Sequence, residues 1–113
     1  MIQITELTNN AKQSFAFTLD NGNDVKFTFI YRPTQMSWYF DFEYNNIVSR
    51  GNKLVLDCNL LRQFKNLIPF GLMLISKDSI DPYSIDDFVN DRVNVYILNE
   101  EDLNTLEGVI YSG

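Results

Sequence analysis

Alternation of apolar and polar residues runs along much of the chain and predicts β-strands. In the segment 36–44, MSWYFDFEY, large apolar or aromatic side chains fill the even positions, and Tyr39, Asp41 and Glu43 lie between them. Successive side chains of an extended chain point to opposite faces of a sheet. We therefore expect the even positions, including Met36, to face the core, and the odd ones to face water or a partner.

Two alternating segments flank an Asn-Gly pair and predict a β-hairpin. Residues 13–19 read QSFAFTL and residues 25–31 read VKFTFIY, with Asn21-Gly22 between them. Asparagine and glycine tolerate the positive φ that tight hairpin turns require, so this pattern is a strong hairpin signal. Pro33 is expected to end the second strand.

Other segments predict further strands. Alternation at 92–98 and the apolar run at 71–78 indicate two strands, and weaker alternation near the N-terminus indicates a short one. Asn45-Asn46 is expected to turn the chain towards another strand. The tail of residues 99–113 begins acidic and polar, and its Val-Ile-Tyr sequence at 109–111 predicts a short edge strand.

One stretch changes to a helical period. Apolar residues recur at the spacing of one helix face at Leu60, Leu61, Phe64, Leu67 and Ile68. Asp57 or Asn59 is placed to cap such a helix, and Pro69 to end it. We therefore expect one short helix over about residues 58–68.

The acidic stretch that follows predicts a second, smaller helical element. Ser84-x-x-Asp87 is close to a capping box, so a single helical turn is expected over about residues 84–90. The aspartates of this stretch could also offer oxygen ligands to calcium, although they do not match the spacing of a calcium-binding loop. A capped, solvated turn explains the same residues.

No internal repeat, linker or low-complexity block divides the sequence, so we expect residues 1–113 to form a single domain. The chain has 113 residues, 45% of them hydrophobic, which allows a modest core. About six or seven short strands with one helix predict a mainly β fold, either a small antiparallel sandwich or a partly open barrel. The expected core residues are Phe17, Phe27, Phe29, Trp38, Phe40, Phe42, Leu61, Phe64, Val95 and Ile97.

Charge is unevenly distributed along the chain, whose net charge is −6. Residues 1–77 carry six acidic and eight basic side chains, whereas residues 78–113 carry nine acidic side chains and one basic side chain, Arg92, for a formal charge of −8. Phosphate binding relies on Lys and Arg, so this balance argues against nucleic acid as a partner. A surface of one sign favours a neighbour of the other sign.

The sequence offers little for catalysis or metal binding. It contains no histidine, which is the commonest general base and metal ligand, and no glycine-rich phosphate loop. Asp41 and Glu43 could form a carboxylate pair of the glycosidase type. Alternation of this kind is, however, the usual solvated face of a half-buried strand. We therefore expect no enzyme activity, no metal site and no cofactor.

Cys58 is the only cysteine, so no intramolecular disulfide can form. Its apolar neighbours Leu56 and Leu60 indicate a small core residue. The N-terminal sequence MIQITELTNN lacks the pattern of a signal peptide, and no segment has the roughly 20 apolar residues of a membrane span. We expect a protein that is soluble when made and has no membrane partner.

Aromatic residues are abundant for a chain of this size: nine Phe, six Tyr and one Trp make up 14% of it. Tyr39 and Tyr96 fall on strand faces opposite the main apolar set, where tyrosine often marks a contact surface. Scattered exposed aromatics are the alternative explanation. The candidate partner-contact residues are Tyr39, Asp41, Glu43, Tyr96, Asp86, Asp87, Glu100, Glu101 and Asp102.

The order of these signals resembles a known family. The series consists of the F-x-F-x-L strand, the Asn-Gly turn, W-x-F-D-F at 38–42, Gly51, N-L-L at 59–61, P-F-G-L at 69–72, D-P at 81–82 and R-V-x-V-Y-I-L at 92–98. As an ordered series over about residues 15–102, it is similar to the baseplate plug proteins of contractile-tailed bacteriophages, of the cyanophage type.

The resemblance implies a non-enzymatic virion component that sits at the central hub of the tail baseplate and packs against hub and tail-tip proteins. Such a component would be assembled in the host cytoplasm and be present in several copies per virion. The charge suggests a different hypothesis. In that hypothesis the protein is a small acidic phage-encoded inhibitor or binding module, in which residues 78–113 mimic the charge of nucleic acid.

Overall fold

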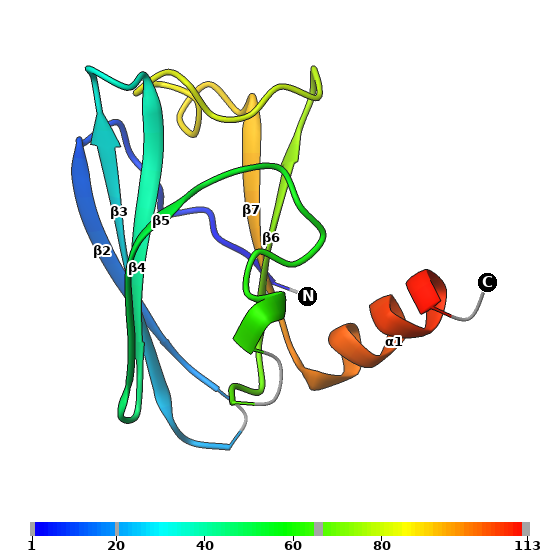
Figure 1. Ribbon diagram of the computed structural model, residues 1–113. Coiled ribbons are helices and arrows are strands. Elements are labelled where there is room, and N and C mark those ends of the chain that lie inside the picture. Colours follow the sequence, from blue (N-terminus) through cyan, green and yellow to red (C-terminus); the bar gives the residue numbers. More distant parts are fainter. Residues whose placement is uncertain (1, 20, 65–66, 112–113) are drawn as a thin grey trace.

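Two antiparallel β-sheets face one another in the protein (Figure 1). The computed structural model describes residues 2–19, 21–64 and 67–111, with the backbone alone for 107–111. The larger sheet contains β2 (Lys12–Thr18), β3 (Asp24–Arg32), β4 (Ser37–Tyr44) and β5 (Ile47–Lys53). The smaller sheet contains β1 (Ile2–Gln3), β6 (Gly71–Ser76) and β7 (Val93–Leu98). The helical elements are a 3-10 helix (Arg62–Phe64) and the helix α1 (Glu100–Tyr111).

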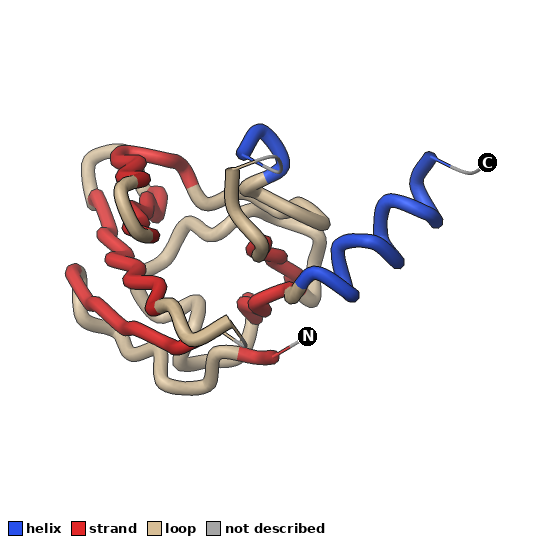
Figure 2. Tube along the Cα trace, turned by 90° about the horizontal axis from the view of Figure 1, so that it is seen from below, coloured by secondary structure: helices blue, strands red, loops and turns tan. Residues whose placement is uncertain are grey.

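The larger sheet is a series of hairpins with strand order β2-β3-β4-β5, and the smaller sheet has the order β1-β7-β6. The N-terminal strand therefore pairs with a strand from near the end of the chain. Within the described residues the sheets do not close into a barrel (Figure 2). The expected mainly β class with about six or seven strands is confirmed: the structure has seven, in a sandwich of two antiparallel sheets.

The hairpin turns use residues that accept a positive φ. Gly22 has a φ of 85°, and its amide donates to the carbonyl oxygen of Leu19 at 2.9 Å. Asn45, with a φ of 52°, turns β4 into β5. Glycine and asparagine adopt this conformation at low cost. The turns predicted at these two places are therefore present, and they fix the register of the strands they join.

Aromatic residues of β3 and β4 form the centre of the core. Phe27 lies opposite Phe42, with ring centroids 6.0 Å apart. Phe29 lies opposite Phe40, with ring centroids 6.3 Å apart. All four side chains are buried, and tilted or edge-to-face ring contacts add to the gain from burial. The structure also buries Trp38, Leu61, Val95 and Ile97, while Phe17 and Phe64 are half-buried at the margin of the core.

Met36 does not face the core, so that part of the prediction is wrong. Its side chain is 59% exposed, and its φ is 49°. Its amide donates to the carbonyl oxygen of Pro33 at 3.1 Å, which places it in the turn between β3 and β4. Strand β4 begins one residue later, at Ser37. A residue in the turn does not follow the alternation of the strand.

The helix predicted over residues 58–68 is much shorter in the structure. Among the described residues of this stretch, Arg62–Phe64 form a 3-10 helix, and residues 65–66 lie outside the described part of the chain. Leu67, expected on the apolar helix face, is 63% exposed. Cys58 is also exposed rather than a small core residue.

Hydrogen bonds to β6 explain why the chain does not form a longer helix here. The side-chain oxygen of the buried Asn59 accepts the amides of Leu61 and Leu72, at 3.0 and 3.2 Å. Just before it, the Asp57 carbonyl oxygen accepts the amide of Leu74 at 3.1 Å. Because residues 57–60 are held against β6, no helix begins at residue 58. Among the described residues of this stretch an i to i−4 bond, from the Ile68 amide to the Phe64 carbonyl oxygen at 3.1 Å, occurs only further along.

The C-terminal segment is helical, so the edge strand predicted at 109–111 is wrong. Its acidic residues form the first turn of α1. The Asn99 side-chain oxygen accepts the Asp102 amide at 2.8 Å, and an oxygen of Asp102 accepts the Asn99 amide at 3.1 Å. This reciprocal capping box starts the helix, and acidic residues near its positive end stabilise it further.

Helix α1 leads away from the sandwich after its first turn (Figure 2). A Cβ on Gly71 would lie 2.9 Å from Cδ2 of Leu103 in α1 and 2.7 Å from Oδ1 of Asn59. Both distances are too short for a side-chain carbon, so glycine leaves the room that these neighbours occupy. Gly71 therefore allows the helix to start against the end of β6.

Trp38→Ala is expected to lower the free energy of unfolding by about 3–5 kcal/mol, because it opens a large cavity in the core. The indole is fully buried and lies 4.9 Å from the Phe88 ring, between centroids. Urea unfolding followed by circular dichroism measures the loss. Val48→Ala, at an exposed position on β5, is the control and should change stability by under about 0.5 kcal/mol. An unchanged melting temperature for Trp38→Ala would contradict its core position.

Candidate interaction surface

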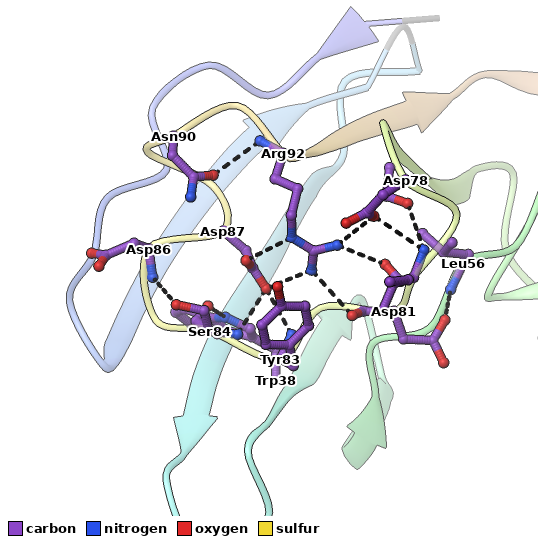
Figure 3. A network of polar contacts seen from close by, with 12 residues as sticks. Trp38, Leu56, Asp78, Asp81, Tyr83, Ser84, Asp86, Asp87, Asn90 and Arg92 are labelled. Carbon is purple, nitrogen blue, oxygen red and sulfur yellow. Dashed lines mark hydrogen bonds and ion pairs between the residues drawn. The ribbon is translucent and has the colours of Figure 1, made fainter.

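The connection between β6 and β7, residues 77–92, closes one end of the sandwich and is called the Arg92 loop below (Figure 1, yellow). It contains the helical turn expected over 84–90, in which the Asn90 amide donates to the Asp86 carbonyl oxygen at 3.0 Å. In Figure 3 a network of polar contacts converges on the Arg92 side chain.

The Arg92 guanidinium uses all five of its N–H donors within this loop. Nε and Nη2 donate to the two carboxylate oxygens of Asp87, each at 2.8 Å. Nη1 donates to Oδ1 of Asp78 at 2.7 Å and to the carbonyl oxygen of Ile80 at 3.1 Å. Nη2 also donates to the carbonyl oxygen of Asp81 at 3.1 Å. Bidentate, charge-assisted bonds are among the strongest in proteins, so one side chain fixes the loop at four residues.

Asp87 is the buried partner in this network, and its side chain is 1% exposed. Besides Arg92, it accepts the backbone amides of Tyr83 at 2.6 Å and Ser84 at 2.8 Å. Burial raises the pKa of this carboxyl, but the hydrogen bonds from Arg92 and the two amides outweigh it and hold the pKa below its usual value. The Asp87 carboxylate is enclosed and fully engaged by these donors, and its contact with a partner stays a prediction.

The inner side of the Arg92 loop packs onto the core. Nε1 of Trp38 donates to the Ser84 carbonyl oxygen, and the Tyr31 hydroxyl donates to the Tyr83 carbonyl oxygen, both at 2.9 Å. The buried Phe88 adds its ring to the aromatic core beside Trp38. The loop is therefore part of the wall of the core and not a free connection.

The outer side of the Arg92 loop presents exposed apolar side chains. Ile80, Tyr83 and Val89 are 51%, 41% and 50% exposed. The Tyr83 ring also covers Arg92, whose guanidinium carbon lies 4.4 Å from the ring centroid, a favourable cation–π distance. Hydrogen bonds fix the backbone of the loop, so these exposed side chains project from an ordered segment. Apolar and aromatic side chains presented in this way are typical of protein contact sites.

Acidic side chains share this outer side. Asp78, Asp81, Asp86 and Asp91 are all exposed. Burial opposes ionisation of Asp78, but hydrogen bonds from the Ile80 amide and from Arg92 lower its pKa. Oδ1 of Asp81 accepts the amide of Leu56 at 2.9 Å and so ties the loop to the segment after β5. The aspartates considered as calcium ligands thus bond mainly to donors of the protein itself.

The sequence did not single out Ile80, Tyr83 or Val89. They follow neither the period of a strand nor that of a helix, so pattern analysis does not select them. The available signal was that these three apolar residues occur in a segment rich in aspartate and containing a proline. Solvated polar residues are the norm in such a segment.

Tyr39, Asp41 and Glu43 lie on the outer face of the larger sheet. Oδ1 of Asp41 accepts the amide of Gly51 at 2.8 Å, next to an irregularity in the pairing of β4 with β5. The Tyr39 ring lies under the guanidinium of Arg32, at 5.0 Å. Glu43 is exposed. This face is polar and carries charges of both signs.

The remaining candidates lie elsewhere. Tyr96 is half-buried on the smaller sheet, between Gln3 of β1 and Met73 of β6. Glu100 and Glu101 begin α1, which starts at the end of the sandwich opposite the Arg92 loop (Figure 1). The candidate contact residues therefore occupy separate surfaces rather than one site.

The fold and these surfaces define a small β-sandwich protein with a hydrogen-bonded loop that exposes apolar and acidic side chains, as in proteins that act by contact. Among the described residues, no group of three or more metal-ligating side chains is arranged to hold a metal ion. No helix in the same part of the chain is long and apolar enough to cross a membrane.

The particular family is given by comparison with known proteins. A family model described as "Cyanophage baseplate Pam3 plug gp18" matches residues 1–100, so the chain belongs to this baseplate plug family. No curated protein matches the chain. The family is that of a structural component of a phage tail baseplate, which favours a non-enzymatic role and contacts with other baseplate proteins. The resemblance found in the sequence is confirmed.

Arg92→Met is expected to lower the free energy of unfolding by about 3–5 kcal/mol, because it leaves the Asp87 carboxylate buried without its cation. Arg92→Lys should recover little of this loss, since an ammonium group cannot reproduce the planar fork. Urea unfolding at neutral pH measures both. Lys77→Met is the matched control: it breaks the exposed ion pair with Asp91 and should cost under about 1 kcal/mol. Equal losses for Arg92→Met and Lys77→Met would contradict the central role of Arg92.

Acid is expected to destabilise the protein through the same network. The pKa values of Asp87 and Asp78 lie below 3.8 in the folded state, so in acid the unfolded chain takes up protons before the folded one. The two carboxylates contribute fully to stability at a pH above the pKa of aspartate in the unfolded chain. This contribution is lost as the pH falls through their folded pKa values. Urea unfolding at about pH 6 and about pH 3 measures the loss. Asp87→Asn should lose less between these pH values than the unchanged protein, and an equal or larger loss would refute the assignment.

Proposed function

We propose that the protein is a plug-like subunit at the central hub of the tail baseplate, where it packs against hub and tail-tip proteins and catalyses no reaction. Membership of the baseplate plug family over residues 1–100 supports this role. In this proposal residues 1–113 act as one domain, several copies are present per virion, and assembly takes place in the host cytoplasm.

The outer side of the Arg92 loop is the docking surface in this proposal. Ile80, Tyr83 and Val89 supply apolar area that a partner can bury. Interfaces that are permanent are richer in apolar contacts than transient ones. The hydrogen bonds of Arg92 hold the loop in place before binding, which reduces the entropy lost when a partner orders it.

The charge of the loop indicates the chemistry of the partner. Asp81, Asp86 and Asp91 expose carboxylates on the same loop as the apolar side chains. A complementary surface has an apolar centre flanked by lysine or arginine. Charges at the margin of an interface act more on the rate of association and on the choice of partner than on affinity.

The inhibitor hypothesis has less support, because the acidic residues are divided. Asp86 lies on the Arg92 loop, whereas Glu100 and Glu101 lie at the opposite end of the sandwich (Figure 1). Asp87 is paired with Arg92 inside the protein. Mimicry of nucleic acid requires carboxylates along one surface, in the manner of phosphates along a strand. Division of the charge between two ends favours a structural role.

Co-expression with the hub proteins of the same phage, followed by size-exclusion chromatography with light scattering, tests the proposal. The expected result is a stable complex of fixed stoichiometry. The double variant Ile80→Ser with Val89→Ser should weaken that complex by about tenfold or more, through loss of buried apolar area. Val48→Ser, at an equally exposed valine on β5, is the matched control and should leave the complex intact.

The outcomes separate the two parts of the proposal. If the protein elutes alone beside an intact hub, the hub placement is wrong. If the complex forms and the double variant binds as well as Val48→Ser, the hub placement stands and the docking surface lies elsewhere. Binding that disappears with moderate salt, in the double variant and the unchanged protein alike, would favour an interaction carried by charge.

A further inference from the structure

Three of the four sheet edges in the described residues are unsuited to pairing with another strand. Strand β1 has two residues. The edge of β6 is occupied by the bond between the Leu74 amide and the Asp57 carbonyl oxygen. Strand β5 carries Arg50 and Lys53, and Gly51 within it has a φ of 73°. Short length, cover, charge and irregularity are the devices by which proteins prevent unwanted strand pairing.

Strand β2 is the remaining edge, and it shows few of these devices. It has seven residues, pairs with β3 without a register shift, and carries one charge, at Lys12. Backbone bonds join Leu19 to Asn23 and Ala11 to Tyr31 on its inner side. Because bonding alternates along an antiparallel pair, the odd residues between them also bond to β3. The even residues of β2 therefore direct their backbone groups outward.

No backbone bond from elsewhere in the described chain reaches these outward groups. They belong to Lys12, Ser14, Ala16 and Thr18. Such a row of free donors and acceptors is a template for a further strand.

The side chains of β2 also leave apolar surface uncovered. Phe15 and Phe17 are half-buried, whereas their neighbour Phe27 on β3 is fully buried. The two rings stack on Phe27, at 5.5 and 6.0 Å between centroids, and no further strand covers their other side within the described residues. A strand added beside β2 would cover them and complete the larger sheet.

We propose that β2 pairs with β2 of a second copy of this chain, antiparallel and about a two-fold axis at Phe15, so that the two larger sheets join into one. Phe15 is the central residue of the strand, and this register places even residues opposite even residues. The outward donors of each copy then meet the outward acceptors of the other, as an antiparallel ladder requires. Symmetric pairing of this kind is the commonest form of homo-oligomer.

The side chains are complementary in the same register. Lys12 of one copy lies opposite Thr18 of the other, whose hydroxyl donates to Asp24 at 2.6 Å, so the cation approaches a carboxylate. Ser14 lies opposite Ala16, and no like charges face each other. On the inner side, Phe15 meets Phe15, a pairing that stabilises adjacent strands. The pairing does not depend on where in the baseplate the protein sits.

Sedimentation equilibrium of the full chain tests the proposal. A reducing buffer excludes dimers formed through the exposed Cys58. The expected result is a mass that rises with concentration to twice that of one chain. Ser14→Pro should weaken the dimer by about tenfold or more, because it removes an outward donor while keeping every backbone bond to β3. Ser14→Ala is the matched control: it keeps the donor, loses the same hydroxyl and should dimerise normally.

Two further measurements keep the test decisive. If Ser14→Pro does not fold, Ala16→Lys replaces it, since the introduced lysines of the two copies would repel across the junction, and Val48→Lys on β5 is its control. Amide hydrogen exchange of Ser14 and Ala16 should slow as the dimer forms. A single-chain mass at all concentrations would falsify the proposal, and so would a dimer that persists unchanged in the folded Ser14→Pro variant.

Discussion

The bidentate pairing of Arg92 with Asp87 is the interaction on which one whole end of the structure depends. It fixes a loop that has no sheet partner. It therefore determines which part of the core the loop covers and which side chains the loop exposes to solvent. Inward, the loop completes the core around Trp38 and Phe88. Outward, it holds Ile80 and Tyr83 at the surface. A buried carboxylate is costly without a cation beside it, so the loop is stable in this form only with Arg92 paired to Asp87.

Strand positions could be predicted from the sequence, because alternation is a local property. Phe27 and Phe29 are two residues apart, as are Phe40 and Phe42, and half-buried strands impose that period wherever they lie. Turn chemistry added the boundaries at Gly22 and Asn45, since few residues accept a positive φ. Met36 shows the limit of the method: alternation continues one residue beyond the strand, and the pattern alone does not say where the strand begins.

Features that depend on distant contacts could not be predicted in this way. The apolar residues after Asn59 have the spacing of a helix, but that side chain bonds to the amide of Leu72 and draws the segment onto β6. Arg92 and Asp87 are five residues apart, yet nothing in their spacing distinguishes a buried pair from two solvated charges. The capping box at Asn99 and Asp102 was a local signal, and it would have indicated the final helix.

Hydrogen bonds close the Arg92 loop where it joins β6 and β7, as well as at its centre. Arg92 bonds to Asp78 near the end of β6, and its own carbonyl oxygen accepts the amide of Lys77 at 3.0 Å. The residues between them behave as a cyclic peptide held at the ends of two adjacent strands. A mechanical load applied anywhere on this ring is therefore divided between β6 and β7, and neither strand is peeled away alone. For a component of a tail baseplate, the end of the sandwich that presents Ile80, Tyr83 and Val89 is thus also the end at which a load reaches both strands together.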